Sequence, residues 1–447
     1  MKNEKAVIII FSALVILMGI GLWASAARKA GFANPDVEDS EARWNDLRVF
    51  YGAGRRAFRD INIYKNPTSP EGRYYIFPPF FAIICAPVAA LGWKVFVIIW
   101  FVASFAGIVA AALLCAGIAR CKPGKSSLVA LAFLALVFCA RPLISDFQNG
   151  QVNSFIFLLT SLSLFMFTRK QDSASGIVMA LAASIKMTAL IFLPYFLLKG
   201  AYKTALGMLL GLLLTLFLLP MICLGPSRMS SLYSSFYDKM VGPFTTVTDA
   251  PEVYSEAGQS LRAAAGRYLT ETNAAHHSDE EIYVNFANLS EGTVWKIVLA
   301  GCIVLTLLTA FCARANPGDK TRRDLIALEL GAVLLLMLMV SPMSRKAHFV
   351  VLALPFAAVL NYLHLHGGDS QRRGYWRLLI VVTAAAFIIF NLTSPGVVGK
   401  KAAVYLLALS LFFFATLGLW LASCLTLLKE RPARKPRPSR PVNIPLE

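Results

Sequence analysis

Residues 6–24 read AVIIIFSALVILMGIGLWA, a stretch without a charged side chain that decides the fold class. As an α-helix this stretch is long enough to cross about 30 Å of hydrocarbon at 1.5 Å per residue. Lys2 and Lys5 precede it. The sequence Ala24-Ser25-Ala26 resembles a signal-peptidase site, but the apolar cores of signal peptides run to about 7–15 residues. We therefore expect an uncleaved first helix.

The rest of the chain has the same character. The 447 residues are 57% hydrophobic and 15% charged, whereas soluble globular proteins average about 45–50% and 25%. The sequence therefore predicts an all-α polytopic transmembrane bundle with about 11 to 13 crossings, including short re-entrant or interfacial helices. The further apolar stretches lie near residues 95–119, 127–141, 153–168, 176–198, 205–225, 293–313, 325–340, 347–363, 378–392 and 402–427.

The net charge of +18 is best explained by topology. In a soluble protein it would indicate a nucleic-acid partner, but here the basic residues cluster between apolar stretches, so we expect no nucleic acid. The positive-inside rule then places both termini in the cytoplasm. We expect the protein in the inner (plasma) membrane of the cell. The inward connectors carry Arg120, Lys122, Lys125, Arg169, Lys170, Lys199, Lys203, Arg314, Lys320, Arg322, Arg323, Arg372, Arg373 and Arg377, and the short outward ones only Arg141, Arg345, Lys346, Lys400 and Lys401.

Two apolar segments do not fit simple crossings. For the loop charges to alternate, residues 176–198 must cross twice or dip in and return, and Lys186 and Pro194 favour two half-helices. Residues 76–92 (IFPPFFAIICAPVAALG) are short and rich in proline, which predicts a re-entrant or interfacial helix on the outer side.

The expected organisation is a single polytopic membrane domain over residues 1–428. Two long outward loops, 25–75 and 226–292, interrupt it, and residues 429–447 form a basic, proline-rich cytoplasmic tail. Of the eight cysteines only Cys121 lies outside an apolar run, so we expect buried thiols rather than disulfides.

Several polar segments are expected to meet on the outer membrane face. Together they supply a carboxylate, amides, cations and an imidazole at one depth, which are the components of a site at the membrane surface. The segments are the loop 25–75 with Asp46, Tyr51 and Tyr75; residues 141–153 (RPLISDFQNGQVN) with Asn149, Gln151 and Asn153; Lys186; residues 341–348 (SPMSRKAH) with Arg345, Lys346 and His348; and the loop 226–292.

Each of these residues also has a structural explanation. Asp46 could be a solvated carboxylate, although the amphipathic stretch after it, LRVFYGAGRRAF, predicts an interfacial helix that holds it near the bilayer. A lysine in hydrocarbon costs about 2.5–3.5 kcal/mol, which makes Lys186 a functional candidate unless it snorkels to the interface.

The other candidates have similar alternatives. The amides could cap helices or join them, and Arg345 with Lys346 could be an interfacial anchor. A lone histidine such as His348 is more often structural, and His276 and His277 with their acidic neighbours are best explained as a solvated loop. The sequence has no P-loop, Rossmann glycine pattern or G-x-S-x-G elbow, so no soluble nucleotide site is visible.

The order of these polar and aromatic segments resembles the polytopic glycosyltransferases of family 87, which have the GT-C fold and include polyprenol-phosphate-mannose-dependent mannosyltransferases. The similarity covers about residues 40–200 well and 325–365 loosely. Met187-Thr188-Ala189 stands where the family often has a proline, and loop 226–292 matches no family element that we can name. The matching elements are Asp46-Leu47 with Tyr51, Asn62-Ile63-Tyr64, Tyr74-Tyr75, Phe77-Pro78-Pro79-Phe80, Pro87, Asn149-Gly150-Gln151-Val152-Asn153, Gly176, Ile185-Lys186, Pro194, Ser341-Pro342 and His348.

The resemblance implies transfer of a mannose-like hexose from a polyprenyl-phosphate donor to a lipid or glycan acceptor on the outer face, with inversion. Asp46 would be the general base that accepts the proton of the acceptor hydroxyl. No acid is implied beside it, because a phosphate leaving group departs as an anion and needs no protonation. Lys186, Arg345 and Lys346 would stabilise the departing phosphate and His348 would donate a hydrogen bond. We expect no metal or other cofactor. The residues implied in orienting or binding substrate are Gln151, Asn153, Asn149, Tyr51 and Tyr75.

Two other classes of protein remain open. A transporter or lipid flippase also uses broken helices and intramembrane lysines, but no symmetry between the two halves of this sequence is visible. A lipid-linked glycan polymerase or ligase typically has a large arginine-rich late loop, whereas loop 226–292 has four basic and nine acidic residues.

Overall fold

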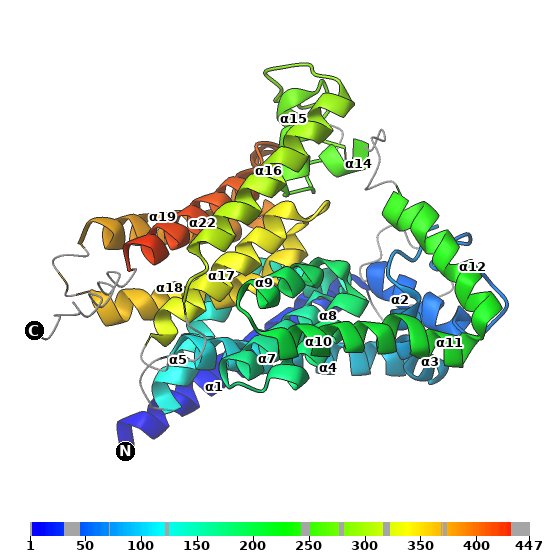
Figure 1. Ribbon diagram of the computed structural model, residues 1–447, viewed down its shortest axis with the longest axis horizontal. Helices are drawn as coiled ribbons and strands as arrows, with labels where there is room; N and C mark the ends of the chain where they lie inside the picture. Colours follow the sequence, from blue (N-terminus) through cyan, green and yellow to red (C-terminus); the bar gives the residue numbers. More distant parts are fainter. Residues whose placement is uncertain are drawn as a thin grey trace, which may run out of the picture.

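The computed structural model describes residues 2–30, 45–70, 72–120, 125–242, 251–276, 281–315, 322–367, 369 and 373–430. Every regular element in these ranges is a helix, and most helices run along the long direction of one bundle (Figure 1). The prediction of an all-α polytopic bundle is confirmed. The cytoplasmic tail predicted for residues 429–447 lies outside the described ranges beyond Glu430.

Seven described helical segments are long and apolar enough to cross a membrane, or eight if one bent pair is a single span. The bent pair is α5 (Lys125–Phe138) with α6 (Ala140–Asn149), which meet at 68°. The seven are α1 (Lys2–Ala30), α4 (Trp93–Ala119), the run α10 (Tyr202–Leu212), η2 (Leu213–Leu218) and α11 (Leu219–Leu224), α16 (Glu291–Cys312), η4 (Lys346–Leu352) with α18 (Ala353–His366), α19 (Arg373–Leu392) and α22 (Leu411–Lys429).

Shorter helices fill the space between these spans. The expected 11 to 13 crossings would have to include several of these, so that count stays a prediction. They are α3 (Pro79–Ala90), α7 (Asn153–Thr168), α8 (Asp172–Ile185), η1 (Met187–Ile191), α9 (Phe192–Leu198), α17 (Arg323–Val340), α20 (Pro395–Val398) and α21 (Lys400–Ala408).

The half-helices predicted around Lys186 are present. Helix α8 ends at Ile185, Lys186 has an extended backbone with φ −142° and ψ 113°, and η1 and α9 follow. The start of α8 packs against the start of α10, which comes just after α9: a Cβ on Gly176 would lie 2.0 Å from the Thr204 carbonyl oxygen. The chain therefore enters along α8, turns at Lys186 and returns along α9.

Helix α2 (Asn45–Arg56) is the predicted amphipathic helix. Its apolar face is covered by α3, since Leu47 and Phe50 are buried and Phe50 contacts Phe81 with ring centroids 5.3 Å apart. A Cβ on Gly52 would lie 1.8 Å from the carbonyl oxygen of Thr68, so the loop backbone packs directly on the helix. Protein therefore covers most of α2, and its first turn is held in a fixed position. Helix α3, with 12 residues, is too short to span about 30 Å, in agreement with the sequence prediction.

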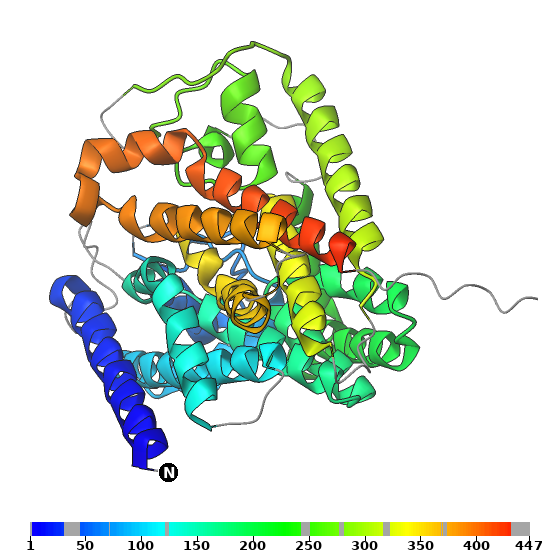
Figure 2. The same ribbon diagram turned by 90° about the vertical axis from the view of Figure 1, so that its left-hand side faces the viewer.

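The second long loop contains helices of its own: α12 (Pro226–Phe236), η3 (Tyr237–Val241), α14 (Pro251–Tyr254) and α15 (Leu261–Leu269). Figure 2 shows its α15 part above α19 and α22. Arg267 is completely buried there and donates hydrogen bonds to the carbonyl oxygens of Tyr254, Ser255 and Gly258 and to Ser410 Oγ. This part of the loop is thus fixed to the chain just before α22.

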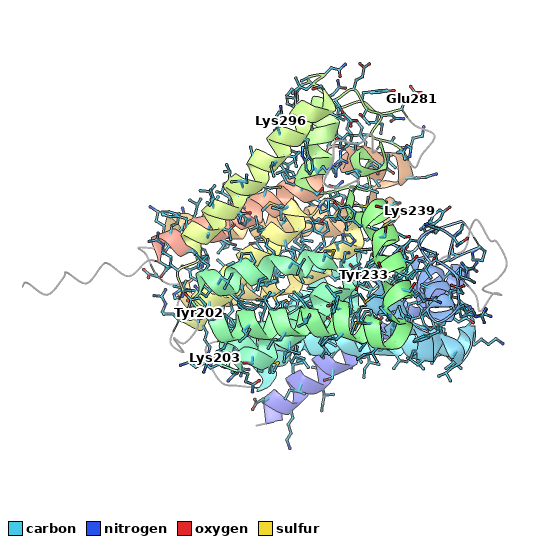
Figure 3. All side chains as sticks on the ribbon, turned by 45° about the vertical axis from the view of Figure 1, so that its right-hand side comes forward. Tyr202, Lys203, Tyr233, Lys239, Glu281 and Lys296 are labelled. Carbon is cyan, nitrogen blue, oxygen red and sulfur yellow. The ribbon has the colours of Figure 1, made fainter. Side chains whose placement is uncertain are left out.

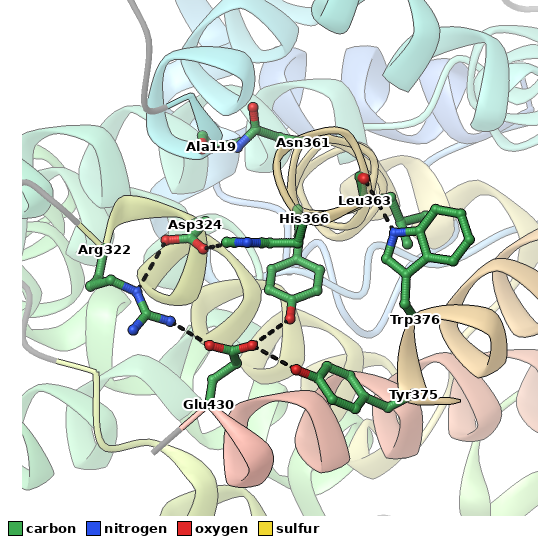
Figure 4. Close-up of polar contacts among 10 residues, drawn as sticks. Ala119, Arg322, Asp324, Asn361, Leu363, His366, Tyr375, Trp376 and Glu430 are labelled. Carbon is green, nitrogen blue, oxygen red and sulfur yellow. Dashed lines mark hydrogen bonds and ion pairs between the residues drawn. The ribbon is translucent and has the colours of Figure 1, made fainter. Parts of the chain in front are cut away.

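The far end of the bundle is closed by polar contacts among four helix ends (Figure 4). Glu430, after α22, accepts hydrogen bonds from Tyr362 and Tyr375, both at 2.8 Å, and pairs with Arg322 at 2.8 Å. Asp324, at the start of α17, lies 2.8 Å from His366 at the end of α18. Helices α17, α18, α19 and α22 are therefore tied together at the end where the sequence places the cytoplasm.

Candidate active site

Asp46 lies in the first turn of α2, where the helix N-terminus favours a negative charge. Gln151 Nε2 donates a hydrogen bond to Asp46 Oδ2 at 2.5 Å, and Arg73 lies 3.6 Å from Oδ1 in an ion pair. The Asp46 side chain remains 29% exposed. The carboxylate is therefore oriented by two partners and still open to a ligand.

The turn between α6 and α7 brings Gln151 to this carboxylate. Gly150 has φ +61°, in the left-handed region that favours glycine, and a Cβ there would lie 2.6 Å from Leu47 Cβ. The backbone of the turn can thus pack against the first turn of α2 only without a side chain at position 150. The sequence Asn149-Gly150-Gln151 is consequently a structural part of the site.

Asn153 links this carboxylate to a lysine. Its Nδ2 donates to Gln151 Oε1 at 2.6 Å and to Asp146 Oδ1 at 3.0 Å, which uses both amide hydrogens. Its Oδ1 accepts a hydrogen bond from Lys186 Nζ at 2.9 Å. A continuous hydrogen-bonded chain therefore runs from Asp46 through Gln151 and Asn153 to Lys186, and we call these four residues the polar chain.

Lys186 is available to the polar chain because its own helix breaks there. It also lines a small cavity of about 20 Å³, enough for about one water molecule. The backbone N–H of Arg345 donates to Nδ1 of His348 at 3.2 Å, which fixes the imidazole. The other residues around this cavity are Asn153, Ile156, Thr188, Met337, Leu338, Ser341, Ser344, His348 and Val351.

Burial raises the pKa of the Asp46 carboxyl above its ordinary value. Arg73, the hydrogen bond from Gln151, and the positive charges of Arg345 and Lys186 each counteract this rise and lower the pKa. A carboxylate with a raised pKa accepts a proton more readily near neutral pH than an exposed aspartate does. The electrostatics of Asp46 therefore suit a general base.

Arg345 and His348 lie beside the polar chain, but Lys346 does not. The charged groups that act on Lys346 are Arg141 and Glu256, which belong to the start of α6 and to the second long loop. The outward Arg-Lys pair thus divides between two places, and only Arg345 contributes to the field at Asp46.

The aromatic candidates pack into the protein around α3. The ring of Tyr51 lies against Trp93 and Phe96, with centroids 5.3 and 5.4 Å apart. Tyr75 is fully buried and donates a hydrogen bond to the Pro78 carbonyl oxygen at 3.1 Å. In these positions Tyr51 and Tyr75 support α2 and the first long loop. They would influence substrate binding only through the residues that they hold in place.

Asn149 is close in sequence to the polar chain but turns away from it. Its exposed amide donates to the Ser145 carbonyl oxygen at 2.8 Å within α6. Two residues that the sequence analysis did not single out are nearer: Asp146, 1% exposed, bonds to Asn153, and Arg73 pairs with Asp46. Asp146 stands in the polar segment 141–153, whereas nothing in the sequence distinguishes Arg73 from other loop arginines.

The second long loop supports the segment before Arg345. The backbone N–H of Gln259 donates to the Ser344 carbonyl oxygen at 2.6 Å, and Ser260 Oγ donates to that of Pro342 at 3.4 Å. The Gln259 amide also donates to the Leu407 carbonyl oxygen and accepts from the Phe412 N–H. The loop therefore helps to set the position of Arg345.

Among the described residues, no three His, Cys, Asp or Glu side chains gather in a way that could hold a metal ion. The expectation of a reaction without a metal or other cofactor stays a prediction.

Comparisons with known proteins agree with this architecture. Residues 75–342 match the model of glycosyltransferase family 87, a range that begins after Asp46. A polyprenol-phosphate-mannose-dependent alpha-(1-2)-phosphatidylinositol mannoside mannosyltransferase of Mycobacterium tuberculosis is 29% identical over 44% of this chain and 48% of its own length. A polyprenol-phosphate-mannose-dependent alpha-(1-2)-phosphatidylinositol pentamannoside mannosyltransferase of Mycolicibacterium smegmatis is 33% identical over 37% and 39%. The similarity thus spans less than half of each relative, and no solved structure matches the chain.

Proposed function

The chain belongs to glycosyltransferase family 87, and on that premise we propose that it transfers a mannose-like hexose from a polyprenyl-phosphate donor to a lipid or glycan acceptor. The observation that carries the proposal is the polar chain, in which the carboxylate of Asp46 and the ammonium of Lys186 are joined through two amides. A base and a cation held in one hydrogen-bonded chain are what attack by a hydroxyl and departure of a phosphate require.

In the proposed reaction an acceptor hydroxyl gives its proton to Asp46 as its oxygen bonds to the anomeric carbon of the donor sugar. The bond from that carbon to the phosphate oxygen breaks at the same time, and the polyprenyl phosphate leaves with the electron pair. Attack from the side opposite the leaving group inverts the anomeric carbon. The phosphate departs as an anion, so Asp46 is the single proton acceptor that the reaction needs.

Lys186 and Arg345 are the proposed partners of the departing phosphate, with His348 beside them. Both positive charges act on Asp46, so they lie close enough to the base to share one substrate with it. Gln151 and Asn153 fix the carboxylate and the ammonium, and the second amide hydrogen of Gln151 can bond to a sugar hydroxyl. Because these side chains are held in advance, little reorganisation is needed when charge develops on the phosphate.

We place this site on the outer face of the inner membrane, with both termini in the cytoplasm. The support is that the polar chain and the four tied helix ends lie at opposite ends of the bundle: α17 starts at the tied end and leads to Ser341 beside Lys186. Of the basic connector residues that the structure describes, Arg322 pairs with Glu430 at the tied end, and Lys199 Nζ bonds to the Ala313 carbonyl oxygen. Figure 3 likewise shows Tyr202 and Lys203 far from Tyr233 and Lys239.

The test is transfer by the purified protein reconstituted in sealed liposomes. Polyprenyl phosphates that carry mannose, glucose or galactose are offered with a phosphatidylinositol mannoside as acceptor, and lipid products are identified by mass spectrometry. We expect product from the mannosyl donor and inverted configuration at its anomeric carbon. Movement of unreacted donor across the bilayer without any product would instead favour a transporter or flippase and would overturn the proposal.

A further inference from the structure

A second cavity lies away from the polar chain, at the corner between α11 and α12. Its volume is about 440 Å³, within the range of small-molecule sites. It has a charged and hydroxylated lining next to one end of a membrane span. The lining residues are Asp60, Ile61, Asn62, Leu224, Gly225, Pro226, Ser227, Arg228, Ser231 and Leu232.

The cavity combines two kinds of recognition chemistry. Arg228 supplies a cation whose Nε is buried and has no hydrogen-bond partner in the described structure. No side chain caps the N-terminus of α12 at Gly225, so the positive end of the helix also faces this corner. Asp60, the hydroxyls of Ser227 and Ser231, and the one amide hydrogen of Asn62 that is not donated to Ser235 Oγ offer the acceptors and donors that bind polyols. A phosphate joined to a hydroxyl-rich ring satisfies both parts.

The position of the cavity indicates that this phosphate belongs to a lipid. The span that ends at Leu224 exposes Leu214, Phe217 and Ile222 along its length, and Ile222 is 78% exposed. A lipid whose acyl chains run along this apolar helix has its headgroup at the level of Gly225, where the helix turns. The cavity therefore lies at the level of a membrane lipid's headgroup.

The cavity is connected to the candidate active site by α2. Arg228 donates a hydrogen bond to the carbonyl oxygen of Arg56 at the end of α2, at 3.1 Å. Asp46 lies ten residues earlier on this helix, about 15 Å away at 1.5 Å per residue. A donor phosphate must be next to its anomeric carbon and hence next to the base, so a phosphate bound here belongs to the other substrate.

We propose that this cavity holds the phosphoinositol-type headgroup of an acceptor lipid, whose sugars extend along α2 to Asp46. The proposal rests on the proposed function for the identity of the second substrate. It explains why polar groups gather so far from the polar chain. It also selects acceptors that carry sugars beyond the phosphate, because a bare headgroup does not reach the base.

The test compares two tryptophan substitutions on neighbouring serines of α12. Both serines are exposed, but Ser231 lines the cavity and Ser230 does not. Full-length Ser231→Trp, Arg228→Gln and the control Ser230→Trp are titrated with dioleoyl phosphatidylinositol, dioleoyl phosphatidylcholine and polyprenyl-phosphate mannose, and binding is measured by native mass spectrometry. We expect Ser231→Trp and Arg228→Gln to weaken phosphatidylinositol binding about tenfold or more, with phosphatidylcholine, the donor and the control unchanged.

Two outcomes overturn the inference. Unchanged phosphatidylinositol binding in Ser231→Trp would show that the lipid is held elsewhere, and loss of donor binding would assign the cavity to the donor. Thermal unfolding of each variant separates cavity filling from loss of fold. Since binding is measured without turnover, it is independent of the proposed reaction: selective loss of phosphatidylinositol in a chain that transfers no sugar would contradict the proposed function and leave the lipid site standing.

Discussion

Gln151 Nε2 lies 2.5 Å from Asp46 Oδ2, although 105 positions separate the two residues in the sequence. This hydrogen bond joins the first turn of α2 to the turn between α6 and α7. It is also the first link of the polar chain that leads to Lys186.

Asp46→Asn should severely reduce transfer while the protein still folds and binds donor. The amide keeps the shape of the carboxylate but cannot accept the acceptor's proton, so kcat should fall by about 10²–10⁴. Product formation and donor binding are measured on the same sample. Asp172→Asn, in the first turn of α8 at the opposite end of that helix from Lys186, is the control. Transfer at the wild-type rate by Asp46→Asn would remove this residue as the base.

The rate of transfer should fall on the acid side with an apparent pKa above the ordinary aspartate value of about 3.9. Burial raises the pKa of Asp46 and thereby favours the protonated form, which cannot act as a base. Arg73 lowers this pKa, so Arg73→Gln should move the acid limb to higher pH. The measurement is kcat against pH, with Arg59→Gln as the control. A limb that stays in place or moves to lower pH contradicts this account of Asp46.

Lys186→Gln should reduce kcat by about 10²–10³ with a smaller change in the KM for donor. Its positive charge matters most when negative charge develops on the departing phosphate, and interactions that strengthen in the transition state appear in kcat. Steady-state kinetics with polyprenyl-phosphate mannose measure both constants. Lys203→Gln, an exposed lysine at the start of α10, should leave them unchanged. An increase in KM with kcat unchanged would show that Lys186 binds the donor in the ground state and does not stabilise the transition state.

Gly150→Ala should lower both thermal stability and activity. A Cβ at this position meets Leu47 Cβ at 2.6 Å, and the left-handed backbone adds a penalty of about 1–2 kcal/mol for a residue other than glycine. The turn should therefore move away from α2 and carry Gln151 with it. The unfolding temperature and kcat are both measured. The control is Gly292→Ala, where a Cβ contacts nothing within 4 Å, and equal behaviour of the two variants would contradict the prediction.

Much of the fold could be predicted because lipid imposes simple rules on sequence. Long apolar stretches become helices, and the charge of the connectors sorts them between the two ends. The break at Lys186 was also predictable, since a lysine and a proline inside an apolar run disfavour one straight span. The exact number of crossings could not be obtained this way, because α7, α8, α9 and α17 are helices of intermediate length or charge that pack within the bundle.

The candidate site was predictable in composition and less so in detail. Asp46, Gln151, Asn153 and Lys186 come together as the polar segments indicated, with Arg345 and His348 beside them. Tyr51, Tyr75 and Asn149 stand in matching sequence elements but bond to or pack against other neighbours. Sequence order brings residues to one membrane face, but it does not say which way each side chain points.

The sequence by itself determined the polytopic helical class, the grouping of loops at two ends and the residues that could carry the chemistry. These follow from the cost of placing charge and unpaired backbone groups in hydrocarbon, which acts on each segment separately. The tertiary structure decided that Gly150 packs against Leu47, that Arg73 and Asp146 join the site, and that Lys346 belongs with Arg141 and Glu256. These relationships depend on close packing between segments far apart in the chain, and no local pattern encodes such contacts.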